Sequence, residues 1–123
     1  MGNKRETYRT ECCITTIARL NSKKLECIIV DLSVGGARVS IDKRDLQTQV
    51  GDTIVLDVKT HKKDLTLIGT VVKIMEIETC HRLHVSFDRI SSEDETLLQG
   101  FINHLQLERL RIRRHSELKS SGR

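Results

Sequence analysis

Long apolar runs and paired cysteines are missing from this sequence, and aromatic residues are scarce. No apolar run approaches the roughly 18 residues that cross a bilayer. The polar start of the chain lacks the apolar segment of a secretion signal, and Glu6 stands where a myristoylation signal requires Ser or Thr. These absences predict a cytoplasmic protein without a membrane anchor.

The four cysteines include no C-x-x-C pair, which is the usual spacing of zinc sites and redox motifs. Cys80, His81 and His84 come nearest to a ligand cluster, but free cysteines are more often small buried apolar residues. No Ser, Cys or His lies in a recognised nucleophile motif. We therefore expect no metal site, no cofactor and no enzymatic activity.

Aromatic residues make up only 2% of the chain and are Tyr8, Phe87 and Phe101. Proteins that bind single-stranded nucleic acid normally stack bases on several exposed rings. The charge distribution points the same way. Residues 1–24 and 108–123 are basic, whereas the residues between them are acidic overall. Basic ends favour an anionic ligand, but an acidic middle is a poor track for a nucleic-acid backbone.

Most of the chain alternates apolar and polar residues with the period of two that is typical of strands. Its 123 residues suffice for one domain with a modest core. The alternating segments are 12–20, 25–30, 37–41, 53–59, 65–77 and 82–87. Gly69 predicts a bend or bulge in the fifth of them. Short, evenly spaced strands with one apolar face each favour a small antiparallel barrel.

After Ser91 the period changes to 3.6, which predicts a helix. Ser92 is expected to be the N-cap, with Glu95 completing a capping box. Leu107 and Leu110 fall on the side away from the barrel and are either incidental or a partner surface. The stripe expected to cover the open end of the barrel consists of Leu97, Leu98, Phe101, Ile102 and Leu105.

The predicted fold is therefore mainly β, a small antiparallel β-barrel of about six strands with a C-terminal α-helix. Residues 1–11 are almost wholly polar and are expected to form a flexible arm. The barrel and the helix are assigned to residues 12–115. The basic end of the chain, 116–123, is expected to be disordered.

Two short motifs carry the functional prediction. Arg5 and Arg9 form R-x-x-x-R in the arm, and Asp31, Ser33 and Gly36 form D-x-S-x-x-G within the stretch IVDLSVGGARVSI. Each motif alone is weak, because the arginines could be solvated surface charge and the Asp and Ser could simply cap a turn. Together, in this order on a small barrel, they resemble the motifs of the PilZ domain family, whose members bind cyclic di-GMP.

The resemblance covers roughly residues 4 to 112. The stretches LIGTVVKI and LHVSF look like later strands of the family, and LLQGFINHLQLERLR looks like its closing helix. His84 departs from the pattern, because many members have Gly there, and Lys4 stands where another Arg often precedes the first motif. The first departure is not expected to affect ligand contacts, whereas the second bears on the number of nucleotides bound. The resemblance implies a bacterial receptor.

The resemblance also implies how the ligand is held. Cyclic di-GMP is a dianion with exposed guanine edges, and an arginine fork can bond guanine O6 and N7 together or pair with phosphate. An ionised Asp accepts from guanine N–H groups, Ser can donate to phosphate, and glycines let backbone amides approach an anion. Arg38 and Lys73 are either further phosphate contacts or solvated strand residues. The implied ligand-binding residues are Lys4, Arg5, Arg9, Asp31, Ser33, Gly35, Gly36 and Arg38.

The mechanism implied is that of an adaptor. Cyclic di-GMP would order the arm on the barrel, and a partner protein would read the new surface. Because only four residues precede Arg5, we expect the output to be delivered in trans. Two alternatives stay open: a small basic barrel that binds nucleic acid, and a PilZ-like interaction module without ligand, which could contact a partner or form a homo-oligomer through Leu107 and Leu110.

Overall fold

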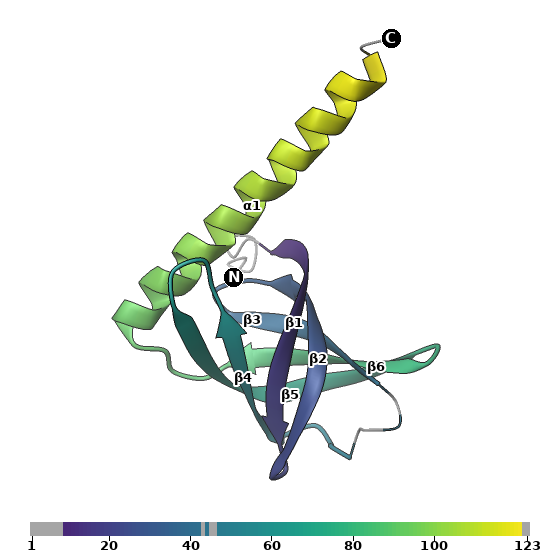
Figure 1. The fold of residues 1–123 in the computed structure, drawn as a ribbon. Coiled ribbons are helices and arrows are strands. Elements are labelled where there is room, and N and C mark those ends of the chain that lie inside the picture. The colour runs from purple at the N-terminus through teal and green to yellow at the C-terminus, as the bar shows by residue number, and fades with distance from the viewer. Residues whose placement is uncertain (1–8, 43, 45–46, 122–123) are drawn as a thin grey trace, which may run out of the picture.

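The computed structural model describes residues 9–121 except 43, 45 and 46, with side chains up to residue 112. Within these residues, six antiparallel strands close into a barrel in the order β1-β2-β3-β6-β5-β4, and one helix, α1, follows (Figure 1). The predicted barrel with a C-terminal helix is confirmed. The elements are β1 (Thr10–Leu20), β2 (Lys23–Leu32), β3 (Gly36–Asp42), β4 (Thr53–Lys59), β5 (Asp64–Ile77), β6 (Cys80–Phe87) and α1 (Ser92–Ser121).

The barrel interior holds the core. Alternate residues of every strand point inward, as the period of two predicts, and each fully buried Leu or Ile contributes about 1.5–3 kcal/mol to folding. The largest side chains with almost no exposure are Ile29, Leu32, Ile41, Ile54, Leu56, Leu67, Leu83, Leu98 and Ile102. The outer face of the barrel is therefore free to carry polar groups.

Three of the strand pairs contain register shifts, and two of these shifts decide which side chains face outward near Asp31 and Lys73. The register of β2 against β3 shifts between Ile29 and Asp31, and that of β5 against β6 shifts between Val71 and Lys73. Because side chains alternate between the two faces, one extra residue in a strand reverses the direction of every residue after it. Ile29 and Val71 are buried in the core, so each shift turns the next polar side chain, Asp31 or Lys73, to the outer face.

The bulge predicted at Gly69 is wrong in position, because the pairing of β5 with β6 is continuous from Gly69 to Val71. Gly69 has a different role. A Cβ added there would lie 2.6 Å from Val85 Cγ1 and 2.7 Å from the Ser86 carbonyl oxygen. Glycine therefore allows β6 to approach β5 closely at this point.

The helix and its N-cap lie one residue earlier in the chain than the sequence suggested. The backbone N–H of Asp94 donates to Ser91 Oγ at 3.1 Å and that of Glu95 donates to the Ser91 carbonyl at 2.9 Å. Ser91, not Ser92, is therefore the N-cap, since its side chain satisfies a free N–H of the first turn. The N-cap was predicted one residue too late because Ser91 and Ser92 are adjacent and both precede the acidic first turn.

Helix α1 packs against β1 and β5 across one end of the barrel and then continues away from it (Figure 1). Leu98, Phe101 and Ile102 of the predicted stripe are buried, and Leu97 and Leu105 pack partly against the core. No helix in the described part of the chain combines the length and the apolar character that a membrane crossing requires.

Two regional boundaries differ from those expected. Strand β1 begins at Thr10, inside the region 1–11 assigned to the arm, because Thr10 is buried and pairs with Leu32. Helix α1 runs to Ser121, past the boundary expected at 115. The predicted site residues Lys4 and Arg5 lie outside the described residues.

Candidate functional site

The connection between β2 and β3 is a tight turn organised by Ser33. The buried Ser33 hydroxyl accepts from the backbone N–H groups of Gly35 at 3.3 Å and Gly36 at 3.2 Å, and it lies 3.2 Å from the Gly36 carbonyl, to which it can donate. The Ser33 backbone N–H donates to the same carbonyl at 2.9 Å. In this structure Ser33 closes the turn, and the two glycine amides face its oxygen.

Gly36 is also required by the neighbouring strand. A Cβ added to it would collide with the carbonyl oxygen of Val85 on β6. The Phe87 N–H donates to the Gly35 carbonyl at 2.9 Å, so the end of β6 is fastened to this turn. Gly36 thus has a structural reason that does not depend on a ligand. Its predicted role in binding an anion stays a prediction.

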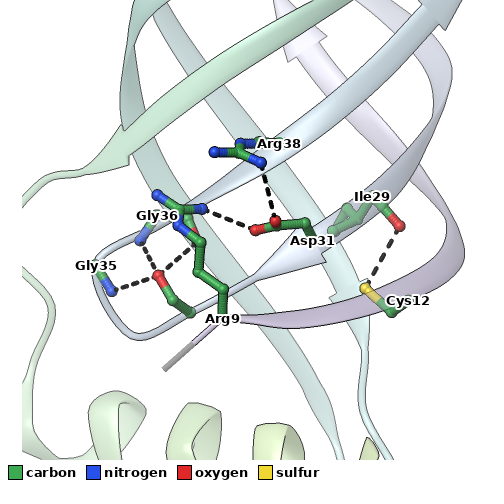
Figure 2. Close-up of polar contacts among 8 residues, drawn as sticks. Arg9, Cys12, Ile29, Asp31, Gly35, Gly36 and Arg38 are labelled. Carbon is green, nitrogen blue, oxygen red and sulfur yellow. Dashed lines mark hydrogen bonds and ion pairs between the residues drawn. The ribbon is translucent and has the colours of Figure 1, made fainter. Parts of the chain in front are cut away.

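Asp31 joins the two sequence motifs. Its carboxylate accepts from Arg9 Nη1 at 2.7 Å and from Arg38 Nη1 at 3.4 Å, as Figure 2 shows. Arg9 directly precedes β1, and Arg38 lies opposite Asp31 on β3. Asp31 is only 7% exposed, and a carboxylate that is nearly buried needs charged partners to offset its lost hydration. The second Arg of the first motif and the Asp of the second therefore meet at one point.

Strand pairing places Asp31 at one end of a row of four side chains that crosses the outer face of the barrel. Asp31 is opposite Arg38, Arg38 is opposite His84, and His84 is opposite Lys73. We call these four residues, which lie on β2, β3, β6 and β5, the outer row. Opposite side chains on one face of a sheet have Cβ atoms about 4.5–5.5 Å apart, so their charges interact.

His84 lies in a cationic environment. Burial lowers the pKa of its imidazole below the usual value of 6.5, and the charges of Arg38, Lys73, Arg9 and Arg82 lower the pKa further. The sequence pointed to Arg38 and Lys73 as candidate phosphate contacts but gave no ligand-binding role to His84 or Arg82. Alternation with Leu83 and Val85 could have placed both on the outer face, but the position of Lys73 opposite His84 depends on the bulge in β5.

A hollow of about 310 Å³ lies beside Asp31. The Nε atoms of Arg38 and Arg82 are buried and have no hydrogen-bond partner among the described residues. These donors are suited to an anion, because a guanidinium has five N–H groups and no acceptor. The residues that line the hollow are Glu11, Cys12, Val30, Asp31, Arg38 and Arg82.

Cys12, at the edge of the hollow, is not an activated nucleophile. Burial raises the pKa of its thiol to about 11, helped by the charges of Asp31 and Cys13. Its sulfur lies 3.5 Å from the Ile29 carbonyl and donates to it (Figure 2). The reactive thiolate is therefore scarce near neutral pH. No group of three or more metal-ligating side chains occurs in the described part of the chain.

A second hollow, of about 370 Å³, lies between Arg9 and the helix. Arg9 and Thr10 line one side of it, and Gln106, Arg109 and Leu110 of α1 line the other. Arg109 Nη2 also lies 2.7 Å from Glu11 Oε1.

Comparison with known proteins identifies the family. The model of the PilZ domain matches residues 3–104. No curated protein matches the chain in sequence.

Solved structures share the fold. The PilZ domain of YcgR from Escherichia coli with c-di-GMP superposes with a TM-score of 0.73 at 20% identity, over 85% of this chain and 93% of that one. The Bacillus subtilis inhibitor of motility MotI/DgrA gives 0.72 at 15% identity, over 87% of this chain and 52% of that one. The K. pneumonia MrkH-c-di-GMP complex gives 0.73 at 17% identity, over 87% and 54%.

This chain thus spans about half the length of MotI/DgrA and MrkH. Identities this low show a common fold, whereas the family model covers most of the sequence. The chain belongs to the PilZ domain family.

Proposed function

We propose that this protein is a receptor for cyclic di-GMP without enzymatic activity, and that the ligand binds on the outer face of the barrel beside Asp31. The observation that carries the proposal is the 2.7 Å contact between Arg9 and Asp31, which brings the two PilZ motifs together. The similar YcgR and MrkH structures were solved with c-di-GMP, which supports the choice of ligand.

Arg9 and Asp31 can give up their contact with each other and contact groups of the ligand instead. The Arg9 side chain is 47% exposed, so its guanidinium can turn from the carboxylate to a phosphate or to guanine O6 and N7. The carboxylate of Asp31 would then accept from guanine N–H donors. Arg38, which also contacts Asp31, is placed to hold the carboxylate in position during this exchange.

The residues before Arg9 would complete the site. Four residues of extended chain span about 14 Å, so Arg5 and Lys4 can reach a ligand that Arg9 touches. In the proposed mechanism these residues close over cyclic di-GMP, and a partner protein reads the surface made by ligand and barrel. Ser33, Gly35 and Gly36 shape the floor of the site through their turn.

The described aromatic residues favour this proposal over the alternative of a nucleic-acid-binding barrel. Phe101 is buried, and Phe87 packs against the core. Neither ring is presented on the surface for bases to stack on, which single-strand binding normally requires.

The test is calorimetric titration of cyclic di-GMP into the wild type and Arg9→Ala, with GTP as the competing nucleotide control. Loss of one bidentate arginine contact costs about 1–3 kcal/mol, which is tenfold to more than a hundredfold in affinity. We expect tight, saturable binding by the wild type, a loss of this size in Arg9→Ala and no comparable binding of GTP.

Arg19→Ala is the matched control variant. Arg19 lies near the other end of β1, is also 47% exposed and also contacts a carboxylate, with Nη2 at 3.0 Å from Asp57 Oδ1. Its replacement should leave affinity unchanged. Equal losses in the two variants would mean that general charge, and not the motif, drives binding. A wild type that does not bind cyclic di-GMP would refute the proposed function.

A further inference from the structure

The outer row places an imidazole between two cations. His84 on β6 lies directly opposite Arg38 on β3 and directly opposite Lys73 on β5. Leu83 and Val85, the neighbours of His84 in sequence, are buried, so His84 itself faces outward. The row ends at Asp31, whose carboxylate is already occupied by Arg9 and Arg38.

The charges that shift the pKa of His84 are all cationic. Arg82 precedes it by two residues on the same face of β6, and Arg9 acts on it from the start of β1. Glu11 lies opposite Asp31 but is paired with Arg109 at 2.7 Å. The surroundings of the imidazole are therefore cationic on β3, β5 and β6, and an empty site favours its neutral form.

We propose that His84 couples ligand binding to proton uptake: a phosphate of cyclic di-GMP lies over Arg38, His84 and Lys73, and the imidazole becomes protonated as the ligand binds. This inference rests on the proposed function and names a residue that determines the pH dependence of the same site. Its chemistry is simple. A dianion neutralises the cations that oppose protonation, and a protonated imidazole has two N–H donors where the neutral ring has one.

The direction of the effect follows from linkage. In the free protein the pKa of His84 is lowered by burial and by the neighbouring cations, whereas the bound anion raises it. Between those two pKa values the complex holds more protons than the free protein, so affinity increases as the pH falls. One proton gives at most a tenfold change in affinity for each pH unit.

The experiment is titration of cyclic di-GMP into the full chain at about pH 7.5 and about pH 5.5, each in two buffers of different ionisation enthalpy. The buffer comparison counts the protons taken up. For the wild type we expect proton uptake of up to one per ligand and an affinity at the lower pH that is severalfold to about a hundredfold higher.

Two variants of His84 test whether this residue is the source. His84→Gln keeps a polar side chain that cannot be protonated, so binding should persist near pH 7.5 while the pH dependence and the proton uptake disappear. His84→Arg carries a permanent charge, so binding should be equally tight at both pH values. His61→Gln is the matched control. His61 also has a lowered pKa but stacks on α1, and its replacement should leave the pH dependence of binding as in the wild type.

The outcomes separate the two proposals. No binding of cyclic di-GMP at either pH overturns the proposed function and this inference with it. Binding by the wild type without proton uptake, or proton uptake that survives in His84→Gln, overturns the inference alone and leaves the receptor intact.

Discussion

Gly36 shows how one residue can satisfy a family motif and a packing requirement together. Because an added Cβ would collide with the Val85 backbone, Gly36→Ala should destabilise the barrel by about 1–3 kcal/mol, the usual cost of overpacking. Urea unfolding measures the change. Gly100→Ala in α1 is the matched control, since nothing lies within 4 Å of its added Cβ, and it should stabilise the protein by about 0.5–1 kcal/mol. A Gly36→Ala protein as stable as the wild type that fails to bind cyclic di-GMP would instead favour a role in ligand contact.

Sequence reasoning reached some residues of the site and not others, for a physical reason. Arg9 and Asp31 could be predicted because the motifs name them. Their direct contact could not, since the two residues lie 22 positions apart and meet through the pairing of β1 with β2. The neighbours of His84 were out of reach as well. Lys73 comes to lie opposite His84 only through the bulge in β5 after Val71, and no glycine lies at that bulge.

The β4–β5 hairpin and α1 are joined by stacked rings, which gives the contact between these elements a pH dependence. The His61 ring lies 4.2 Å from that of His104 with 2° between their planes, and 6.0 Å from that of Phe101. Burial lowers the pKa of His61, and His104 and Lys62 lower it further. The folded state thus resists a proton that the unfolded chain accepts at its usual pKa of 6.5.

Stability should therefore fall as the pH drops through 6.5 toward the lowered pKa of the folded state, and should be independent of His61 above that range. Urea unfolding at about pH 7.5 and about pH 5.5 measures this. His61→Phe keeps a ring for stacking but cannot be protonated, so it should lose less stability on acidification than the wild type. His84 acts in the same direction in both proteins and cancels in the comparison. An equal loss in both proteins would contradict this role for His61.

At the level of elements the strands were predictable because one face of each is apolar. The alternation read from the sequence lies within the six observed strands, and three members of the helical stripe are buried as expected. Two single positions were predicted wrongly. The cap is Ser91 and not Ser92, and the bulge in β5 lies between Val71 and Lys73 and not at Gly69. Two adjacent serines both satisfy a capping pattern, and only the hydrogen bonds distinguish them.

In the whole molecule, Arg9 and the helix lie on opposite sides of one hollow. Arg9 lines it from just before β1, Leu110 lines it from α1, and the Arg109–Glu11 ion pair joins β1 to α1. A ligand held by Arg9 would therefore lie near the part of α1 that extends beyond the barrel (Figure 1). This arrangement places the proposed ligand and the leucines singled out in the sequence at the same end of the molecule.

Leu107 and Leu110 are 62% and 56% exposed, and Ile112 is 65% exposed on the same stretch of α1. We expect Leu107 and Leu110 to mediate self-association, because they lie three residues apart on one face of α1 and pairing two such helices would remove both from water. Leu107→Asp with Leu110→Asp should abolish a concentration-dependent oligomer in sedimentation velocity. Stability should change by no more than about 0.5 kcal/mol, because both leucines are exposed. Ile17→Asp, on β1 of the barrel and 38% exposed, is the control and should leave self-association unchanged. Identical sedimentation of the wild type and the double variant would show that α1 does not join copies of this chain.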